Sequence, residues 1–209
     1  MPAERPIVLA ITGASGAPYA VRLLGQLIEA RRPVQLIISS HGLRLLETEC
    51  RVKSAADLRE RVGADGWDEL VTIFDDDDRG AAPASGSALN AGMVICPCSM
   101  GTLSAISIGA SRSLVERAAD VALKERRPLV LVPRESPLSA IHLENMLRVT
   151  RAGAVVLPAS PGFYHRPASI DDLVDFVVAR VLDHLAVEHE LAPRWTGDGV
   201  GSARARRRR

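Results

Sequence analysis

Apolar, β-branched runs recur along the chain, and stretches of helical period separate most of them. A run that is apolar without alternation predicts a strand buried on both faces, as in parallel sheets. We predict such strands at residues 6–12, 34–38, 71–74, 93–96, 129–133 and 153–157. Helices are expected at about 17–31, 41–48 and 114–125, in the amphipathic stretch 51–67, and after the turns at 97–103 and 158–169. This alternation predicts the α/β class, with one doubly wound parallel sheet in a single domain.

Two of the predicted strands end in turns of small residues that open a helix. The segment Gly13–Gly16 follows the first strand, and residues 97–103 follow the strand at 93–96. Glycines let the backbone approach a ligand closely, and the first turn of a helix offers free N–H groups to a phosphate. The first turn alone fits a phosphate site and a plain tight turn equally well. Two such turns in one sheet favour a phosphate-bearing cofactor between them.

Polar residues also follow two other strands. Ser39 and Ser40 come after the second strand, where they fit a helix cap and a ligand contact alike. The charged pair Arg134–Glu135 follows the strand at 129–133. A charged pair at the carboxyl end of a parallel strand indicates function more readily than structure, because ligands bind at that edge of such sheets.

Helix starts are marked by two serines near the C-terminal half. We expect Ser136 to cap the helix that follows the fifth strand, with Pro137 in its first position. Ser169 is expected to cap the last long helix, and Asp172 completes a capping box there.

Charged residues of interest lie on two of the predicted helices. Arg117, Asp120 and Lys124 are spaced to share one face of the helix at 114–125, which by itself indicates a solvated face. In the last helix, Arg180 lies beside Phe176, so we expect its guanidinium to be partly shielded from water. A structural ion pair with an acid on another helix would explain that arginine equally well.

The composition is that of an ordinary globular protein. Apolar residues make up 47% of the 209 residues, enough for a sizeable core, and the net charge is +1. A net charge this close to zero does not indicate binding to nucleic acid or to a membrane surface. No apolar run approaches the ~20 residues that are needed to span a bilayer. The N-terminal residues do not have the pattern of a secretion signal. The arginine-rich residues 203–209 are expected to be disordered.

Cysteine and acidic residues indicate neither a disulfide framework nor a metal site. The chain has three cysteines, an odd number, which favours a reducing compartment and a cytoplasmic protein. Cys96 and Cys98 lack a second pair, so we expect the first in the core and the second lining the turn. The acidic run 75–78 is expected to be a solvated loop, and the loop 80–87 to cover a site or meet a neighbouring subunit.

Taken together, these motifs resemble the flavin prenyltransferases of the UbiX/Pad1 type, within the homo-oligomeric flavin-containing Cys decarboxylase folds. The resemblance covers residues 5–195. Its most specific pieces are Thr-Gly-Ala-Ser-Gly at 12–16, Pro-Cys-Ser at 97–99, the run from Glu116 to Val130, Pro-Arg-Glu at 133–135 and Pro-Gly-Phe-Tyr-His at 161–165. It implies a flavodoxin-like, flavin-binding domain over residues 1–195, followed by a disordered basic tail at 196–209 that has no family counterpart.

The activity implied by the resemblance is a metal-independent transfer. A dimethylallyl group from dimethylallyl phosphate is joined to N5 and then to C6 of reduced FMN. The resulting prenylated FMN serves a UbiD-type decarboxylase. Members are homo-oligomers, and the resemblance implies a dodecamer with the site built between subunits.

The resemblance also assigns the site residues. FMN contacts are implied at the two turns and at two strand ends: Gly13, Ala14, Ser15, Ser39, Ser99, Met100, Gly101, Thr102, Leu103 and Arg134. Met100 departs from many relatives, which have Thr or Ile there. The prenyl phosphate is implied at Arg117, Lys124, Tyr164 and Arg180, and acidic active-site positions at Glu49 and Glu135. Of these, Arg117, Lys124, Glu49 and Glu135 are the expected catalytic residues. Fixed cations would stabilise the departing phosphate dianion in place of magnesium.

Two other functions remain open. The first is an FMN-dependent decarboxylase that acts on a peptidyl or pantothenoyl cysteine, a related group with a catalytic histidine after the first helix region. His41 lies near that point, although the four phosphate-binding residues fit prenyl transfer better. The second is a non-catalytic flavin-binding subunit of a decarboxylase complex, against which the presence of Glu135 and Lys124 speaks.

Overall fold

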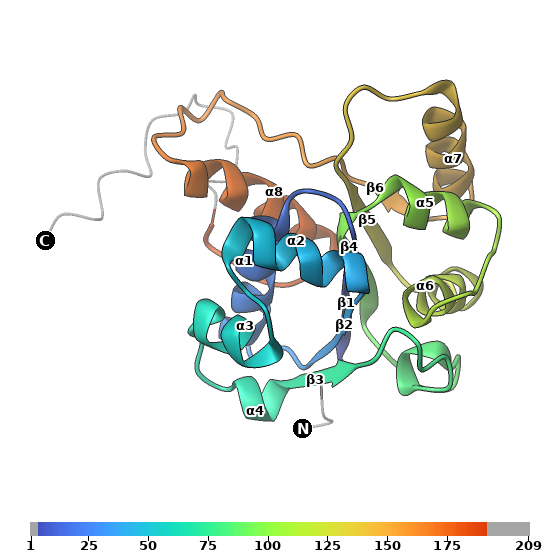
Figure 1. Ribbon diagram of the computed structural model, residues 1–209, viewed down its shortest axis with the longest axis horizontal. Coiled ribbons are helices and arrows are strands. Elements are labelled where there is room, and N and C mark those ends of the chain that lie inside the picture. Colours follow the sequence, from blue (N-terminus) through green and yellow to red (C-terminus); the bar gives the residue numbers. More distant parts are fainter. Residues whose placement is uncertain (1–3, 192–209) are drawn as a thin grey trace, which may run out of the picture.

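A six-stranded, wholly parallel sheet forms the centre of the computed structural model, which describes residues 4–191 (Figure 1). The strand order is β3-β2-β1-β4-β5-β6. The strands are β1 (Ile7–Ile11), β2 (Val34–Ile38), β3 (Val71–Phe74), β4 (Gly92–Cys98), β5 (Leu129–Pro133) and β6 (Val155–Val156). The predicted class, the six strands and the single doubly wound sheet are confirmed. The direction of winding reverses between β1 and β4, which lie side by side.

Helices cover both faces of this sheet. They are α1 (Ala17–Glu29), α2 (Ser40–Cys50), α3 (Ala55–Val62), α4 (Trp67–Leu70), α5 (Met100–Ser107), α6 (Leu114–Lys124), α7 (Ala140–Arg151) and α8 (Ile170–His184), with a short 3₁₀ turn, η1 (Ala82–Ala84). Helices α1, α3 and α8 pack with the apolar cluster on one face, and α5, α6 and α7 with the cluster on the other. Figure 1 shows these as two groups on either side of the strands.

The packing of strand β1 explains why apolar and polar residues do not alternate in its sequence. Ile7, Leu9 and Ile11 face the cluster under α1 and α8, whereas Val8 and Ala10 face the cluster under α5 and α6. Since both faces are covered, all five residues are fully buried. The central strands therefore need apolar side chains at every position.

The start of α7 corrects one prediction. Ser139 caps this helix, not Ser136: its hydroxyl accepts from the N–H of His142 at 3.2 Å, and His142 Nδ1 accepts from the N–H of Ser139 at 3.3 Å. Residues 134–139 are thereby left as an exposed connection that starts at the carboxyl end of β5. The predicted capping box of Ser169 and Asp172 at α8 is present.

Two further expectations are corrected by packing. Cys98 is the last residue of β4 and fully buried, so it belongs to the core. Asp76 is not simply solvated: its Oδ1 accepts from the N–H of Val115 at 2.9 Å at the start of α6. In the loop 80–87, Ala81 and Ala84 join the cluster under α6, and the contact of this loop with a site or a neighbouring subunit stays a prediction.

Two further predictions concern the C-terminal tail and the membrane. The predicted basic tail, residues 196–209, lies outside the described residues. Within residues 4–191, none of the helices is long and apolar enough to cross a membrane.

Candidate functional site

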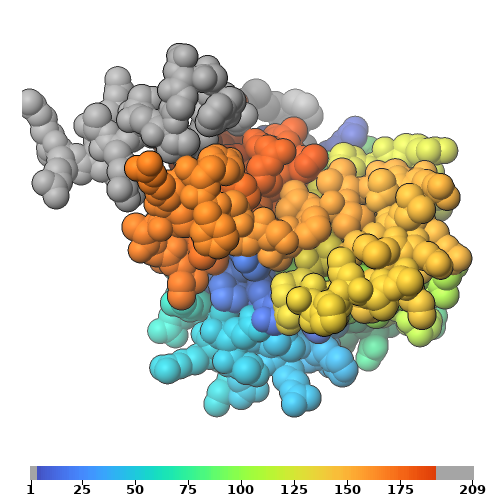
Figure 2. Space-filling model, turned by 90° about the horizontal axis from the view of Figure 1, so that it is seen from above, coloured from blue at the N-terminus to red at the C-terminus, as the bar shows by residue number. Residues whose placement is uncertain are grey.

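Loops that leave the carboxyl ends of the strands meet on one face of the molecule. Figure 2 shows this face, where the blue segment after β1 is bordered by the cyan segment after β2, the yellow segment after β5 and the orange segment after β6. All the strands run in the same direction, so their carboxyl ends share one edge of the sheet. The reversal between β1 and β4 opens the sheet at this edge, as in other doubly wound folds that bind ligands there.

Thr12 joins the two small-residue turns. Its hydroxyl donates to the carbonyl of Pro97 at 2.9 Å and accepts from the N–H of Ser99 at 2.8 Å. Ser99 in turn caps α5, because its Oγ accepts from the N–H of Thr102 at 3.1 Å. Thr12 is only 2% exposed, so these hydrogen bonds are shielded from water and fix the spacing of the turns. The sequence analysis did not identify Thr12 as a site residue. The one feature that could have indicated it is a single hydroxyl side chain at the end of an apolar strand.

Glu49 binds the start of α1. Its Oε2 accepts from the N–H groups of Gly16 at 2.9 Å and Ala17 at 2.8 Å. The expectation that these N–H groups are free for a phosphate is therefore wrong, because a carboxylate of the protein already occupies the positive end of the helix. The side chain comes from the last turn of α2, so it also ties α2 to the turn after β1.

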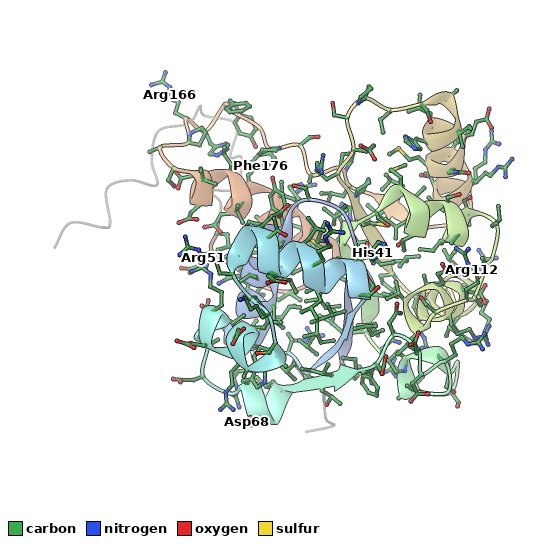
Figure 3. All side chains as sticks on the ribbon, viewed as in Figure 1. His41, Arg51, Asp68, Arg112, Arg166 and Phe176 are labelled. Atoms are coloured by element: carbon green, nitrogen blue, oxygen red, sulfur yellow. The ribbon has the colours of Figure 1, made fainter. Side chains whose placement is uncertain are left out.

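The start of α2 packs tightly against the same turn. Ser39 caps this helix by accepting from the N–H of Gly42 at 3.1 Å, so the cap role that the sequence allowed is present. An added Cβ on Gly13 would lie 2.5 Å from the Cβ of His41, and one on Gly42 would overlap the carbonyl oxygen of Ile11. Both glycines are required by space, and His41 is thereby held over the turn after β1. Figure 3 labels this exposed histidine at the beginning of α2.

Arg134 reaches across the sheet to the first turn. Its Nε donates to the carbonyl of Ser15 at 3.3 Å, so the end of β5 and the end of β1 contact one another. The other guanidinium N–H groups remain available to a ligand, since no partner for them exists among the described residues. Ser15, Ser39, Ser99 and Arg134 thus share one edge, and these hydroxyl and guanidinium donors suit a phosphate group.

Glu135 is exposed and accepts from the N–H of Ser136 at 3.1 Å. A purely structural role for Glu135 would be an ion pair with Arg117. In the structure, Arg117 instead pairs with Asp120 at 2.8 Å on its own helix. The carboxylate of Glu135 is therefore not neutralised by that arginine.

Arg117 and Lys124 share a face of α6, as predicted, but Lys124 lies away from Arg134. Helix α6 leads into β5, so its last residue Lys124 lies at the amino end of the strand, beside Glu125 and Gly86. Arg134 follows the carboxyl end of the same strand. Five residues of β-strand span about 17 Å, so a single copy of the chain does not bring Lys124 and Arg134 to one ligand.

Tyr164 and Arg180 come from the C-terminal part of the described chain. Tyr164 lies in the loop before α8 and is 64% exposed. Arg180 is not shielded as predicted: its side chain is 55% exposed and pairs with Asp183 of the same helix at 2.8 Å, not with an acid on another helix. Asp183 also contacts Nε2 of the buried His189 at 3.2 Å, so it is held on both sides.

The buried thiols of β4 are poorly suited to nucleophilic or metal chemistry. Burial raises the pKa of Cys96 to about 12, and burial together with the neighbouring Cys96 raises the pKa of Cys98 further. Both thiols are therefore protonated near neutral pH, whereas nucleophiles and metal ligands are thiolates. Within the described part of the chain, no cluster of three or more His, Cys, Asp or Glu residues could hold a metal ion.

Comparison with known proteins identifies close relatives. The flavoprotein family model matches residues 1–182. Flavin prenyltransferase UbiX of Pseudomonas aeruginosa is 54% identical over 196 residues, which cover 90% of this chain and 93% of that protein. Its counterpart in Halalkalibacterium halodurans is 50% identical, over 88% of this chain and 90% of that protein.

Comparison with solved structures leads to the same family. AnUbiX (PadA1), in complex with FMN and dimethylallyl pyrophosphate, superposes with a TM-score of 0.84 at 41% identity, over 93% of this chain and 99% of that chain. A dodecameric FMN-dependent UbiX-like decarboxylase from Escherichia coli O157:H7 gives 0.82 at 44% identity, over 92% and 100%. A PPC decarboxylase mutant, at 0.62 and 16% identity over 88% and 100%, shares the fold alone, so it does not favour the cysteine decarboxylase alternative.

Proposed function

Because the chain belongs to the UbiX flavin prenyltransferase family, we propose that it joins the dimethylallyl group of dimethylallyl phosphate to reduced FMN. The C–O bond of the donor breaks, and the phosphate leaves with the electron pair. The dimethylallyl C1 bonds to N5, which loses its proton. The C=C bond of the attached group then takes up a proton at C2, so that C6 bonds to C3 and closes the fourth ring, and C6 loses its own proton. The observation that carries this proposal is the meeting of Ser15, Ser99 and Arg134 at the edge where β1 and β4 separate.

FMN would lie over the carboxyl ends of β1, β2, β4 and β5. The Ser15 and Ser39 side chains, the start of α5 and the free N–H groups of Arg134 are the phosphate and ring contacts. Residues 99–103 give the backbone of the second turn, where Met100 contributes its N–H rather than its side chain. Glu49 contributes indirectly, because it fixes the turn that Gly13 and Ala14 belong to.

The departing phosphate would be held by Arg117, Lys124, Tyr164 and Arg180. Each of the three cations rests beside a carboxylate in the unliganded chain, namely Asp120, Glu125 and Asp183. A phosphate dianion carries more charge than a carboxylate and accepts more hydrogen bonds, so it would compete for these partners. The cations gain most as the C–O bond breaks, when negative charge accumulates on the phosphate.

The site is built between subunits of a homo-oligomer in this proposal. Lys124 and Arg134 lie at opposite ends of β5, so Lys124 of one copy would approach Arg134 of another. Apolar side chains that a monomer leaves exposed also favour contact between copies: Ile108, Ile141, Leu143 and Leu147. A dodecamer is the expected assembly, as in the Escherichia coli relative.

Glu135 would accept the proton that C6 loses, either directly or through the released phosphate. It follows Arg134 on the exposed connection after β5 and keeps a carboxylate that Arg117 does not neutralise. The prenylated FMN then passes to a UbiD-type decarboxylase. The three free cysteines suit a reducing compartment such as the cytoplasm.

One experiment tests the reaction. The purified protein is incubated under anaerobic conditions with reduced FMN and dimethylallyl phosphate, and the flavin is then weighed by mass spectrometry. We expect FMN enlarged by one five-carbon unit, and the same yield when a chelator is present. Lys124→Ala should lose most of this activity, whereas Lys53→Ala, which removes an exposed lysine near α3, should retain it. Unmodified FMN from the wild-type protein would refute the proposal.

A further inference from the structure

Three aromatic rings form a cluster around Tyr164. The ring of His165 lies flat on that of Phe176, with centroids 5.2 Å apart and an angle of 8° between the planes. The Tyr164 ring is nearly perpendicular to both, at 79° to His165 and 78° to Phe176, with centroids 5.6 Å and 5.8 Å away. Edge-to-face contacts of this kind are favourable and have a defined direction. They therefore restrain the tyrosine ring although most of it faces solvent.

Gly162 leaves just enough room for this cluster. A Cβ at this position would lie 3.1 Å from Cζ of Phe176 and 3.1 Å from Cε1 of Tyr164. The requirement is one of space, because any side chain here would push the two rings apart. Figure 3 labels Phe176 on α8, below the loop that carries Gly162.

The Tyr164 hydroxyl has no hydrogen-bond partner among the described residues, so ring packing alone sets its direction. The surroundings of His165 also indicate that its ring serves to hold Tyr164. Both of its ring nitrogens are buried and lack a partner within residues 4–191. Unpaired buried nitrogens are costly, so the imidazole is not kept for hydrogen bonding within the chain. What it supplies is a flat face against Phe176 and a perpendicular ring contact with Tyr164.

We propose that Gly162, His165 and Phe176 are positioning residues, which together form an aromatic seat that aims the Tyr164 hydroxyl at the phosphate of the prenyl donor. This inference rests on the proposed function, in which Tyr164 is a phosphate ligand. A tyrosine held in its binding orientation loses less freedom when the ligand arrives, so the seat raises affinity without touching the donor.

A matched pair of variants separates ring stacking from nitrogen chemistry. His165→Phe keeps the ring and removes the unpartnered nitrogens, whereas His165→Leu removes the ring. We measure the Kd of dimethylallyl phosphate for protein loaded with oxidised FMN, in which no transfer occurs, by titration calorimetry. His165→Phe should match the wild type. His165→Leu and Gly162→Ala should each weaken binding by about 3- to 10-fold, with FMN affinity unchanged.

The same substitutions are then repeated in a Tyr164→Phe protein. If the seat acts through the tyrosine hydroxyl, His165→Leu should cause no further loss in that background. Val178→Ala is the control, since it removes a buried side chain from α8 on a different face of the helix. It should lower the melting temperature without changing the Kd of the donor.

The outcomes distinguish this inference from the proposed function. Equal loss in His165→Leu with and without Tyr164→Phe would overturn the seat, as would equal loss in His165→Phe and His165→Leu. Unchanged binding in both His165→Leu and Gly162→Ala would overturn it as well. In each case the wild-type protein can still prenylate reduced FMN, and a failure of that separate assay refutes the proposed function instead.

Discussion

The carboxylate of Glu49 hydrogen-bonds the backbone N–H of Gly16, 33 residues earlier in the chain, at 2.9 Å. The N–H of Ala17 makes a second bond to the same oxygen. The protein thus supplies its own anion at the positive end of α1, beside the turn proposed to contact FMN. In the proposed function, a cofactor phosphate would therefore be placed by the neighbouring donors, at Ser15, Ser39 and the start of α5.

Replacement of Glu49 by glutamine should loosen this turn. Glu49→Gln keeps the size of the side chain but removes the charge that interacts with the helix dipole, at a cost of about 1 kcal/mol. For a domain of this size, we expect the melting temperature to fall by about 2–4 °C, together with weaker FMN binding. Glu47→Gln on the exposed side of α2 is the control. An unchanged melting temperature and FMN affinity in Glu49→Gln would contradict this role.

Thr12 should couple the two turns in a measurable way. Thr12→Val keeps the volume but leaves the N–H of Ser99 without its buried acceptor, which costs about 1–3 kcal/mol. We expect a lower free energy of unfolding in urea and weaker FMN binding, both restored by Thr12→Ser. Thr48→Val removes an exposed hydroxyl that bonds the carbonyl of Arg44 on α2, and should change neither. The idea fails if Thr12→Ser is as impaired as Thr12→Val.

The helices and strands could be predicted because the residue patterns that mark them are local in the sequence. Strands buried on both faces need an apolar residue at each position, as β1 shows, and Ser169 with Asp172 marks the start of α8 within four residues. The parallel sheet then follows from the alternation of strands and helices. Even the separation of Lys124 from Arg134 is implied by that topology.

What was missed depends on contacts between distant residues. Nothing near Glu49 in the sequence indicates that it binds the start of α1, and nothing near Thr12 indicates its bonds to the turn after β4. Two serines near α7 satisfy the same local rule, and the choice of Ser139 over Ser136 depends on the partner that His142 offers. Arg180 was expected to be shielded, but its neighbour Asp183 holds it at the surface.

The buried thiols predict a loss of stability in alkali. The pKa of Cys96 is about 12 in the fold, above the ordinary value near 9, and the pKa of Cys98 is raised further. Above pH 9 the unfolded chain releases these protons while the folded chain keeps them, so the free energy of unfolding falls as pH rises from 9 toward 12. Urea titrations at pH 8 and pH 10 measure this slope. The double variant Cys96→Ala/Cys98→Ala, although less stable at pH 8, should show a smaller decline.

Glu135→Gln should separate binding from ring closure. Glutamine keeps the shape and the hydrogen bonds of the side chain but cannot accept the proton that C6 loses. FMN binding should be retained, and a single-turnover reaction with reduced FMN and dimethylallyl phosphate should accumulate flavin joined at N5 alone. Absorbance and mass spectra follow both species. Formation of the four-ring flavin at the wild-type rate would rule out the proton-transfer role.

Complementation between two inactive variants tests whether Lys124 and Arg134 of different copies form one site. In Lys124→Ala every subunit lacks the proposed phosphate cation, and in Arg134→Ala every subunit lacks the proposed FMN contact, so each protein alone should be nearly inactive. When the two are co-expressed and assemble at random in equal amounts, about one quarter of the shared sites receive an intact Lys124 from one copy and an intact Arg134 from the other. We therefore expect about one quarter of wild-type activity in the mixed oligomer. If both residues served the same site from one chain, no mixed site would be complete, and the co-expressed protein would stay as inactive as its parents. Mixing the two proteins after separate assembly, without exchange of subunits, is the control and should restore nothing.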